Sequence, residues 1–198
     1  MPRRTLDARS VFTGFTVAIV MLMAGVLLIL GHSSVSNQVY NELAVRKITF
    51  PASNSKDITS LPAADAAAMS KYAGQLLTTG PQAQTYADDF MTVQINGVAG
   101  GKTYAELLVS AAASRKNATV LEIEAANVFR GETIRGQLLN AYAFWKIGQI
   151  MFYAAIATFI VAIALLIGSG LGLARLRRAA AAVQIQPAPA PIPAVETV

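Results

Sequence analysis

The chain contains no cysteine and a single histidine, His32, among its 198 residues. Without cysteine there are no disulfides, thiolate nucleophiles or covalent haem attachments. A single histidine without cysteine cannot supply an ordinary zinc, copper or non-haem iron site. The usual serine-protease triad is also excluded, because His32 is not expected to lie in a folded pocket. We therefore predict no metal, no cofactor and no enzymatic activity. A Ser/Lys dyad using Lys71 or Lys102 stays open, although no motif marks one.

Charged residues are missing from two long stretches, residues 10–41 and residues 147–174. Each stretch contains about 20 consecutive apolar positions, which is enough for a helix to cross a bilayer. The whole chain is 54% hydrophobic with a mean hydropathy of +0.47, which is too apolar for an ordinary soluble domain. The sequence predicts an integral membrane protein that crosses twice.

Arginines flank both apolar stretches on their outer sides. They are Arg3, Arg4, Arg9, Arg175, Arg177 and Arg178. Because positive flanks stay in the cytoplasm, these arginines are expected to serve as topology anchors that hold both termini on the cytoplasmic side of the membrane. The predicted organisation is a cytoplasmic N-terminus (1–10), a transmembrane helix (11–31), an extracytoplasmic helical domain (32–146), a second transmembrane helix (147–174), and a cytoplasmic basic cluster with a disordered Pro/Ala tail (175–198).

The net charge of +5 does not indicate a nucleic-acid binder. Four of the five excess charges lie in the arginine-bearing ends, whereas a duplex binder concentrates basic residues on a folded surface. The expected partners are membrane lipids and other membrane proteins or a second copy, with no nucleic acid.

A cleavable signal peptide is the rival interpretation of the first span. Gly31-His32-Ser33 is a weak cleavage site, but the apolar run Val11–Leu30 exceeds the usual 7–15 residues of a signal peptide. We expect an uncleaved anchor.

Helical signals outnumber strand signals between the spans. Apolar residues recur every four positions from Val35 to Leu43, so the first helix is expected to continue to about Val45. Residues 47–51 are expected to be extended because a proline closes them, and residues 53–60 are expected to form a polar loop.

Two further helices are predicted in the first half of this region. Ser60 is expected to cap one that ends at the Gly-Pro pair 80–81. The next begins at this pair and ends at the Asn-Gly pair 96–97, with a short strand over 91–95 as the alternative.

Two capping boxes predict two more helix starts. Thr103-x-x-Glu106 opens a helix to about Arg115, and Thr119-x-x-Glu122 opens one that runs into the second span. The predicted fold class is therefore all-α: two transmembrane helices extended outward into a small helical extracytoplasmic domain.

Two apparent chemical motifs fail on spacing. Residues 97–103 resemble a phosphate-binding loop, but Asn96 stands where the first glycine is required, and a flexible connector explains them better. Asp88 and Asp89 resemble the paired aspartates of a two-metal site, yet adjacent helical residues point about 100° apart. We interpret them as a solvated helix face.

Gly168 and Gly172 form a GxxxG step in the second span. Glycines four residues apart let two membrane helices approach closely, so this step is a candidate helix-packing face. The alternative is a chance occurrence, since glycine is common in membrane helices.

Five short segments resemble a group of uncharacterised two-span membrane proteins of actinobacteria. They are KYAGQ (71–75), YAD (86–88), GKTY (101–104), FRGETIRG (129–136) and NAY (140–142), and the likeness covers most of residues 35–155. The resemblance implies an actinobacterial plasma-membrane protein. Some members are labelled aromatic ring-opening dioxygenases, a class that needs a His/carboxylate metal site, which the lone His32 does not support.

The leading functional hypothesis is an accessory, structural or assembly component of a larger membrane or envelope complex. The candidate partner contacts are Arg130, Glu132, Arg135 and Asn140, with salt bridging inside the domain as the alternative. The runner-up is an extracytoplasmic ligand-binding or sensing module. Its mark would be a closed apolar pocket among Tyr72, Leu76, Tyr86 and Phe90. An unrecognised enzyme is the second alternative.

Overall fold

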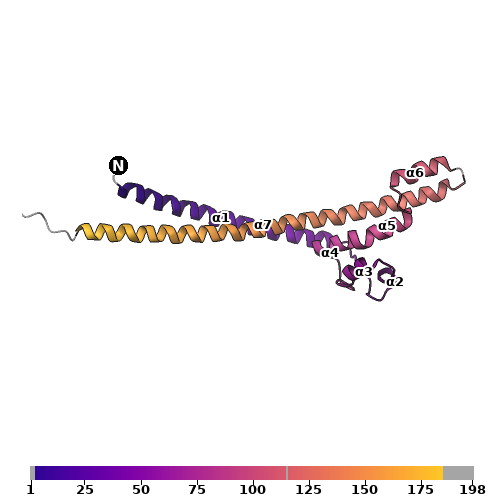
Figure 1. Ribbon diagram of the computed structural model, residues 1–198, viewed down its shortest axis with the longest axis horizontal. Helices are drawn as coiled ribbons and strands as arrows, with labels where there is room; N and C mark the ends of the chain where they lie inside the picture. Colours follow the sequence, from indigo (N-terminus) through magenta and orange to yellow (C-terminus); the bar gives the residue numbers. More distant parts are fainter. Residues whose placement is uncertain (1–2, 115, 185–198) are drawn as a thin grey trace, which may run out of the picture. The chain divides into compact units, whose positions relative to one another are not determined.

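A computed structural model describes residues 3–114 and 116–184, and they are mainly helical. The helical elements in chain order are α1 (Arg3–Ala44), α2 (Lys56–Thr59), α3 (Ala63–Ser70), α4 (Gly80–Thr85), the π-helix η1 (Tyr86–Met91), α5 (Thr92–Ala99), α6 (Tyr104–Ala113) and α7 (Ala118–Gln184) (Figure 1). Within the described ranges, extended pairing is limited to one isolated antiparallel bridge between Thr49 and Leu76. The predicted all-α class is confirmed.

Helices α1 and α7 are the two described helices long and apolar enough to cross a membrane. Their most apolar windows have mean hydropathies of 2.5 and 2.7, yet only 11% of each window is buried within the protein. The core helix of a soluble domain would bury most of such a surface. These two helices instead leave their apolar side chains uncovered.

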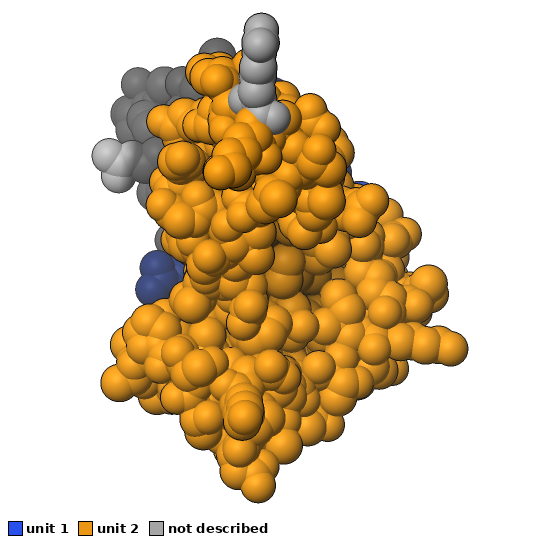
Figure 2. Space-filling model, turned by 90° about the vertical axis from the view of Figure 1, so that its right-hand side faces the viewer, with its two compact units in different colours: residues 1–28, 153–198 blue, residues 29–152 orange. Residues whose placement is uncertain are grey.

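The chain divides into two compact units, coloured separately in Figure 2. The first, hereafter the span unit, comprises residues 1–28 and 153–198, and the second, hereafter the helical domain, comprises residues 29–152. The predicted domain at 32–146 falls within the helical domain.

Small residues bring α1 and α7 together in the span unit. A Cβ added to Gly14 would collide with Ser169 Oγ, and one added to Gly25 would lie 2.8 Å from the Phe159 ring. Along α7, buried small residues recur every seven positions, at Ala155, Ala162 and Ser169. On α1, Ala18 and Gly25 are buried at the same spacing. A seven-residue repeat is typical of helices that supercoil around each other.

The core of the helical domain forms where α1 and α7 meet the short helices. Its buried residues are Val39, Leu43, Phe50, Ile58, Leu61, Met69, Leu77, Ala83, Ala87 and Leu138. The apolar stripe of α1 noted in the sequence supplies Val39 and Leu43, and α1 ends at Ala44, as predicted. A second cluster holds α5 and α6 against α7, through Ile95, Ala99, Leu107, Ala125 and Val128.

The helix expected from Ser60 to residue 79 is mostly wrong. The Ser60 hydroxyl donates to the Lys56 carbonyl at 2.6 Å and so belongs to the end of α2, which lies within the predicted loop. Helix α3 starts after Pro62 without a side-chain cap and ends at Ser70.

The chain leaves the helical conformation after α3 because of Gly74. Its φ is +72°, in the left-handed region that glycine adopts readily. The following residues extend, and Leu77 N–H donates to the Ile48 carbonyl at 2.8 Å. This long-range pairing satisfies backbone groups that a continuing helix would have used internally. The extended conformation expected over residues 47–51 is thus confirmed from residue 48 on, whereas Lys47, with φ +52°, lies in the turn that follows α1.

The next helical run is longer than predicted and changes from α-helix to π-helix and back. It covers α4, η1 and α5 without a break, so the alternative strand over 91–95 is wrong. Gly80 begins this run rather than ending the one before it, and Gly100, with φ +58°, ends it.

Of the two predicted capping boxes, one is confirmed. Thr103 caps α6 and accepts from Glu106 N–H at 3.3 Å, while Glu106 Oε2 accepts from Thr103 N–H at 2.8 Å. The box at Thr119 is wrong because α7 already begins at Ala118. As predicted, α7 then continues unbroken into the second apolar stretch. The predicted disordered tail from Pro187 lies outside the described residues.

Candidate functional site

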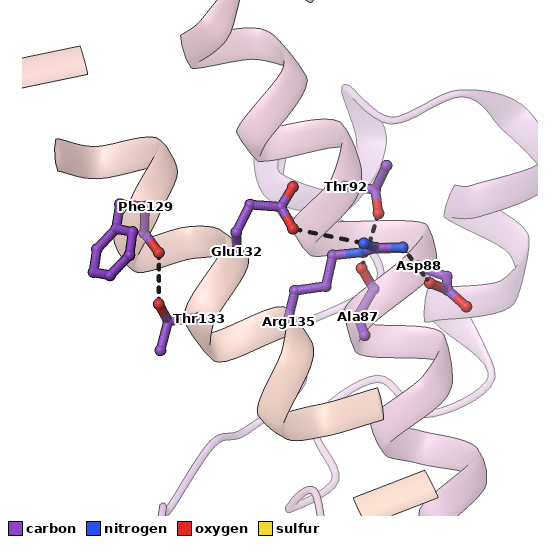
Figure 3. Close-up of polar contacts among 7 residues, drawn as sticks. All are labelled: Ala87, Asp88, Thr92, Phe129, Glu132, Thr133 and Arg135. Atoms are coloured by element: carbon purple, nitrogen blue, oxygen red, sulfur yellow. Dashed lines mark hydrogen bonds and ion pairs between the residues drawn. The ribbon is translucent and has the colours of Figure 1, made fainter. Parts of the chain in front are cut away.

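Two neighbouring features of the helical domain gather its polar side chains: an ion-pair cluster around Arg135 and a cleft between α1 and α7. Arg135 Nη2 lies 3.1 Å from Asp88 Oδ1 of η1, and Arg135 Nη1 lies 3.6 Å from Glu132 Oε2 one turn earlier (Figure 3). These contacts tie α7 to the π-helix. Arg135 and Glu132 therefore form ion pairs inside the domain, which was the alternative to a partner contact.

The π-helix sets the position of two acidic residues. Thr92 Oγ1 donates to the Ala87 carbonyl at 3.1 Å, five residues earlier, and Figure 3 shows this bond beside Arg135. Asp88 forms an ion pair with Arg135, whereas Asp89, the next residue, forms none with a residue that the structure describes. Burial raises the pKa of Asp89, and the nearby carboxylates of Asp65 and Asp88 raise it further, against a smaller lowering by Lys71.

The cleft lies between the outer turns of α1 and the middle of α7 and has a volume of about 200 Å³. It is lined by Val35, Gln38, Val39, Glu42, Leu43, Arg46, Gln137, Asn140, Ala141 and Phe144. Val39 and Leu43 are buried and provide an apolar floor. Arg46 Nη1 donates to Gln137 Oε1 at 2.6 Å and so bridges the two helices at the polar end.

The chemistry of the cleft is that of a binding surface with mixed character. It offers one carboxylate, Glu42, one guanidinium, Arg46, and the amides of Gln38, Gln137 and Asn140 above the apolar floor. Such a lining suits an amphipathic side chain or small molecule, because polar groups can pair at the rim while apolar groups cover the floor.

The remaining predicted contact residues differ in their surroundings. Asn140 is exposed and lines the cleft, so it is the predicted residue best placed for a partner. Arg130 is exposed and forms no ion pair with a described residue. The structure thus brings together Glu132 and Arg135 but leaves Arg130 and Asn140 apart from them.

The predicted GxxxG step is split between two environments. A Cβ on Gly172 would lie 2.7 Å from Val11 Cγ2, whereas a Cβ on Gly168 would meet nothing within 4 Å. Gly172 therefore serves packing between α1 and α7 within the chain, and Gly168 does not. Of the topology anchors, Arg9, Arg175, Arg177 and Arg178 are exposed. Arg3 and Arg4 lie in α1, and their side chains are outside the described set.

The apolar pocket proposed for a ligand-binding module is wrong as placed. Phe50 occupies the space between the rings, with centroids 5.3 Å from Tyr72 and 5.3 Å from Tyr86. Tyr86 in turn packs with its ring centroid 5.0 Å from that of Phe90. These rings belong to the domain core, and Leu76 is exposed.

His32 lies beside α7 rather than in a polar pocket. Its Nδ1 is 2.9 Å from the Gly148 carbonyl oxygen, and its ring is 5.1 Å from that of Phe152. In the part of the chain that the structure describes, no group of three or more potential metal-ligating side chains comes together. Of the glycine-rich segment 97–103, residues 100–103 join α5 to α6 as the predicted connector, with positive φ at Gly100 and Gly101, whereas residues 97–99 belong to α5.

Sequence reasoning missed two features of this region. Thr79 and Gln82 form a capping box at the start of α4, and the buried Gln82 also donates to Gln75 Oε1 at 3.0 Å. The T-x-x-Q spacing was a readable signal for this box. The Arg46–Gln137 bridge had no such signal, because it depends on how α1 and α7 are aligned.

A second patch on the helical domain is apolar and exposed. It centres on Tyr104 of α6 and Phe129 of α7, both of which are exposed. The rings of Tyr104 and Phe129 lie 5.5 Å apart, so the two helices contribute to one surface. Clustered exposed apolar side chains are typical of protein interaction sites.

No family model, curated protein or solved structure matches this chain.

Proposed function

We propose that the protein is an integral protein of the bacterial plasma membrane that crosses twice, through residues 11–31 and 147–174. The observation that carries this proposal is the uncovered apolar surface of both long helices. Phe12 is 74% exposed, Leu27 67% and Ile160 63%. Leaving such a side chain in water loses about 1.5–3 kcal/mol of the free energy that its burial would provide, whereas a lipid bilayer would cover it. The flanking arginines support cytoplasmic termini by the positive-inside rule.

The proposed role is that of a non-catalytic accessory, structural or assembly component of a larger membrane or envelope complex. The helical domain would supply the contacts from the extracytoplasmic side. Two features support this role: the mixed cleft that includes Asn140, and the exposed apolar patch on α6 and α7. The resemblance noted in the sequence implies an actinobacterial setting.

Site-specific photo-crosslinking in native membranes tests the proposed role. A photoreactive residue at Asn140 is compared with one at Asn127, an exposed asparagine on the same helix outside the cleft. We expect Asn140 to capture one defined membrane or envelope protein, which mass spectrometry identifies, and Asn127 not to capture it. Equal capture from both positions, or none from Asn140, would contradict an assembly role through the cleft.

A ligand-binding or sensing function is the second candidate, and the 200 Å³ cleft is the observation that favours it. Native mass spectrometry of the protein in mild detergent would then reveal a bound small molecule. Ala141→Phe, which fills the cleft, should abolish that binding, whereas Ala143→Phe, an exposed neighbour outside the lining, should leave it intact. Equal retention of the molecule by both variants would place its binding elsewhere.

A further inference from the structure

The cleft between α1 and α7 contains two opposite charges that do not pair with each other. Glu42 and Arg46 both line it, one helical turn apart on α1. A glutamate four residues before a basic residue is the favourable order for an ion pair on a helix. Among the described residues, however, the ion pairs are those of Arg135, and neither cleft charge takes part in one. The cleft therefore presents a carboxylate and a guanidinium as two separate groups.

Gln137 of α7 holds the guanidinium away from the carboxylate. Its Oε1 accepts a hydrogen bond from Arg46 Nη1 at 2.6 Å, which directs the guanidinium toward α7. This bond uses one of the five N–H donors of an arginine and leaves its charge unneutralised. Glu42 is exposed and forms neither an ion pair nor a hydrogen bond with any residue in the described ranges. Both charged groups are thus available to a ligand.

An apolar surface adjoins the two charges. The buried side chains of Val39 and Leu43 form the floor of the cleft, and Phe144 of α7 also lines it. A molecule that matched the whole lining would need an ammonium group for Glu42, an acidic group for Arg46 and an apolar body for the floor. An α-amino acid with an apolar side chain carries all three on a single carbon atom.

The size of the cleft fits such a molecule. Its volume of about 200 Å³ lies below the range of about 300–1,000 Å³ that is typical of sites for drug-sized ligands. A larger ligand would therefore extend out of the cleft, whereas a single amino acid can place both its charges and its side chain within the lining.

The position of the charges along α1 favours a ligand from solution over a lipid headgroup. Glu42 lies 11 residues beyond residue 31, the expected end of the first span, which corresponds to about 16 Å along a helix. The headgroup layer of one leaflet is only about 5–8 Å thick. In the proposed membrane arrangement, the two charges consequently face the extracytoplasmic solution.

We propose that this cleft binds a free α-amino acid with an apolar side chain. Glu42 accepts hydrogen bonds from the ammonium group, the remaining N–H groups of Arg46 donate to the carboxylate, and the side chain covers Val39 and Leu43. Asn140, which also lines the cleft, can donate to the carboxylate or accept from the ammonium group through its amide. This inference rests on the proposed membrane insertion and specifies the ligand of the second candidate function.

Isothermal titration calorimetry of the full chain tests the ligand class. The protein is placed in nanodiscs of phosphatidylglycerol, a lipid without an ammonium group, and titrated with L-leucine or L-phenylalanine. We expect saturable binding of these amino acids but none of N-acetyl-L-leucine, which lacks the ammonium group, or of L-leucinamide, which lacks the carboxylate. Failure of both amino acids to bind, or equal binding of either derivative, would overturn the proposal.

A pair of charge-neutralising variants locates the binding. Glu42→Gln should weaken L-leucine binding about tenfold or more, because a hydrogen bond to a charged group is lost. Glu122→Gln is the control, since Glu122 is an exposed glutamate of α7 outside the cleft lining, and it should bind as the natural protein does. Neither glutamate supports the domain through an ion pair with a described residue, so both variants should keep the natural Tm. Equal affinities in the two variants would refute the site.

Nanodiscs that also contain phosphatidylethanolamine test the competing lipid source, because this headgroup carries both an ammonium group and a phosphate. The affinity for L-leucine should stay unchanged in these discs. Loss of L-leucine binding there would assign the cleft to the lipid and overturn the proposal.

Failure of the ligand and failure of the proposed function have different signatures. If alkaline carbonate releases the protein from native membranes, the proposed membrane insertion fails. If the protein stays in the membrane fraction and Asn140 captures a partner, but no amino acid binds, the proposed function stands and only the ligand is wrong.

Discussion

At the scale of single residues, Asp89 gives the helical domain a pH dependence. Because burial and neighbouring carboxylates raise its pKa, Asp89 binds a proton more tightly in the folded protein than in the unfolded chain. This group's contribution therefore falls as the pH rises from the ordinary value of 3.8 through the raised pKa. Asp89→Asn should raise the Tm at neutral pH and flatten its acid-side dependence, measured by thermal unfolding in detergent. Identical pH profiles for variant and natural protein would contradict this.

Thr103 and Thr119 provide a matched pair for testing helix capping. The Thr103 backbone and hydroxyl hydrogen bonds lower the pKa of Glu106, as expected for a carboxylate at a helix start. Thr103→Ala should cost about 1 kcal/mol, seen as faster hydrogen exchange in α6. Thr119→Ala should show no comparable loss, because Thr119 lies inside α7. Equal effects of both substitutions would refute the assignment of the caps.

Residue roles are predictable where the signal is local. The Thr103 box is a four-residue pattern that the sequence displays in full, whereas the Asp88–Arg135 pair joins residues 47 positions apart. The residues around Arg135 carry no pattern that predicts an ion pair with a carboxylate of the π-helix. For that reason the sequence leaves the choice between partner contact and internal ion pair open.

At the scale of elements, Gly80 controls the contact between α4 and α7. A Cβ at Gly80 would collide with the Trp145 side chain, and Gly80 itself is buried. Gly80→Ala should therefore destabilise the domain by about 1–3 kcal/mol through overpacking. Gly97→Ala is the control in α5, where a Cβ meets nothing within 4 Å, and it should stabilise by about 0.5–1 kcal/mol. Thermal unfolding of both variants decides the matter, and a neutral Gly80→Ala would contradict the close approach.

The elements that the sequence predicts well are the long ones. The four-residue apolar period places the end of α1 close to Ala44, and α7 contains no break between Ala118 and Gln184. The segment after Ser70 differs from the predicted helix because its backbone pairs with residues 48–50, far away in the chain. Apolar period alone does not reveal such pairing, and Gly74 is the one local signal of it.

At the scale of the whole molecule, the account depends on two apolar helices that the protein leaves uncovered and a helical domain between them in the chain. The distribution of charge along the sequence predicts this organisation, since two long stretches lack charged residues and arginines flank them. Composition cannot predict the cleft at Asn140. The cleft depends on which faces α1 and α7 turn toward each other within the helical domain.

The most direct test of the two-span account is impermeant maleimide labelling of single-cysteine variants in intact cells. Ser53→Cys lies in an exposed loop of the helical domain, and Ala182→Cys lies beyond the second span. The account predicts that Ser53→Cys is labelled in intact cells, and that Ala182→Cys is labelled only after the membrane is permeabilised. Labelling of Ala182→Cys but not Ser53→Cys in intact cells would contradict it, as would recovery of the protein free of membranes.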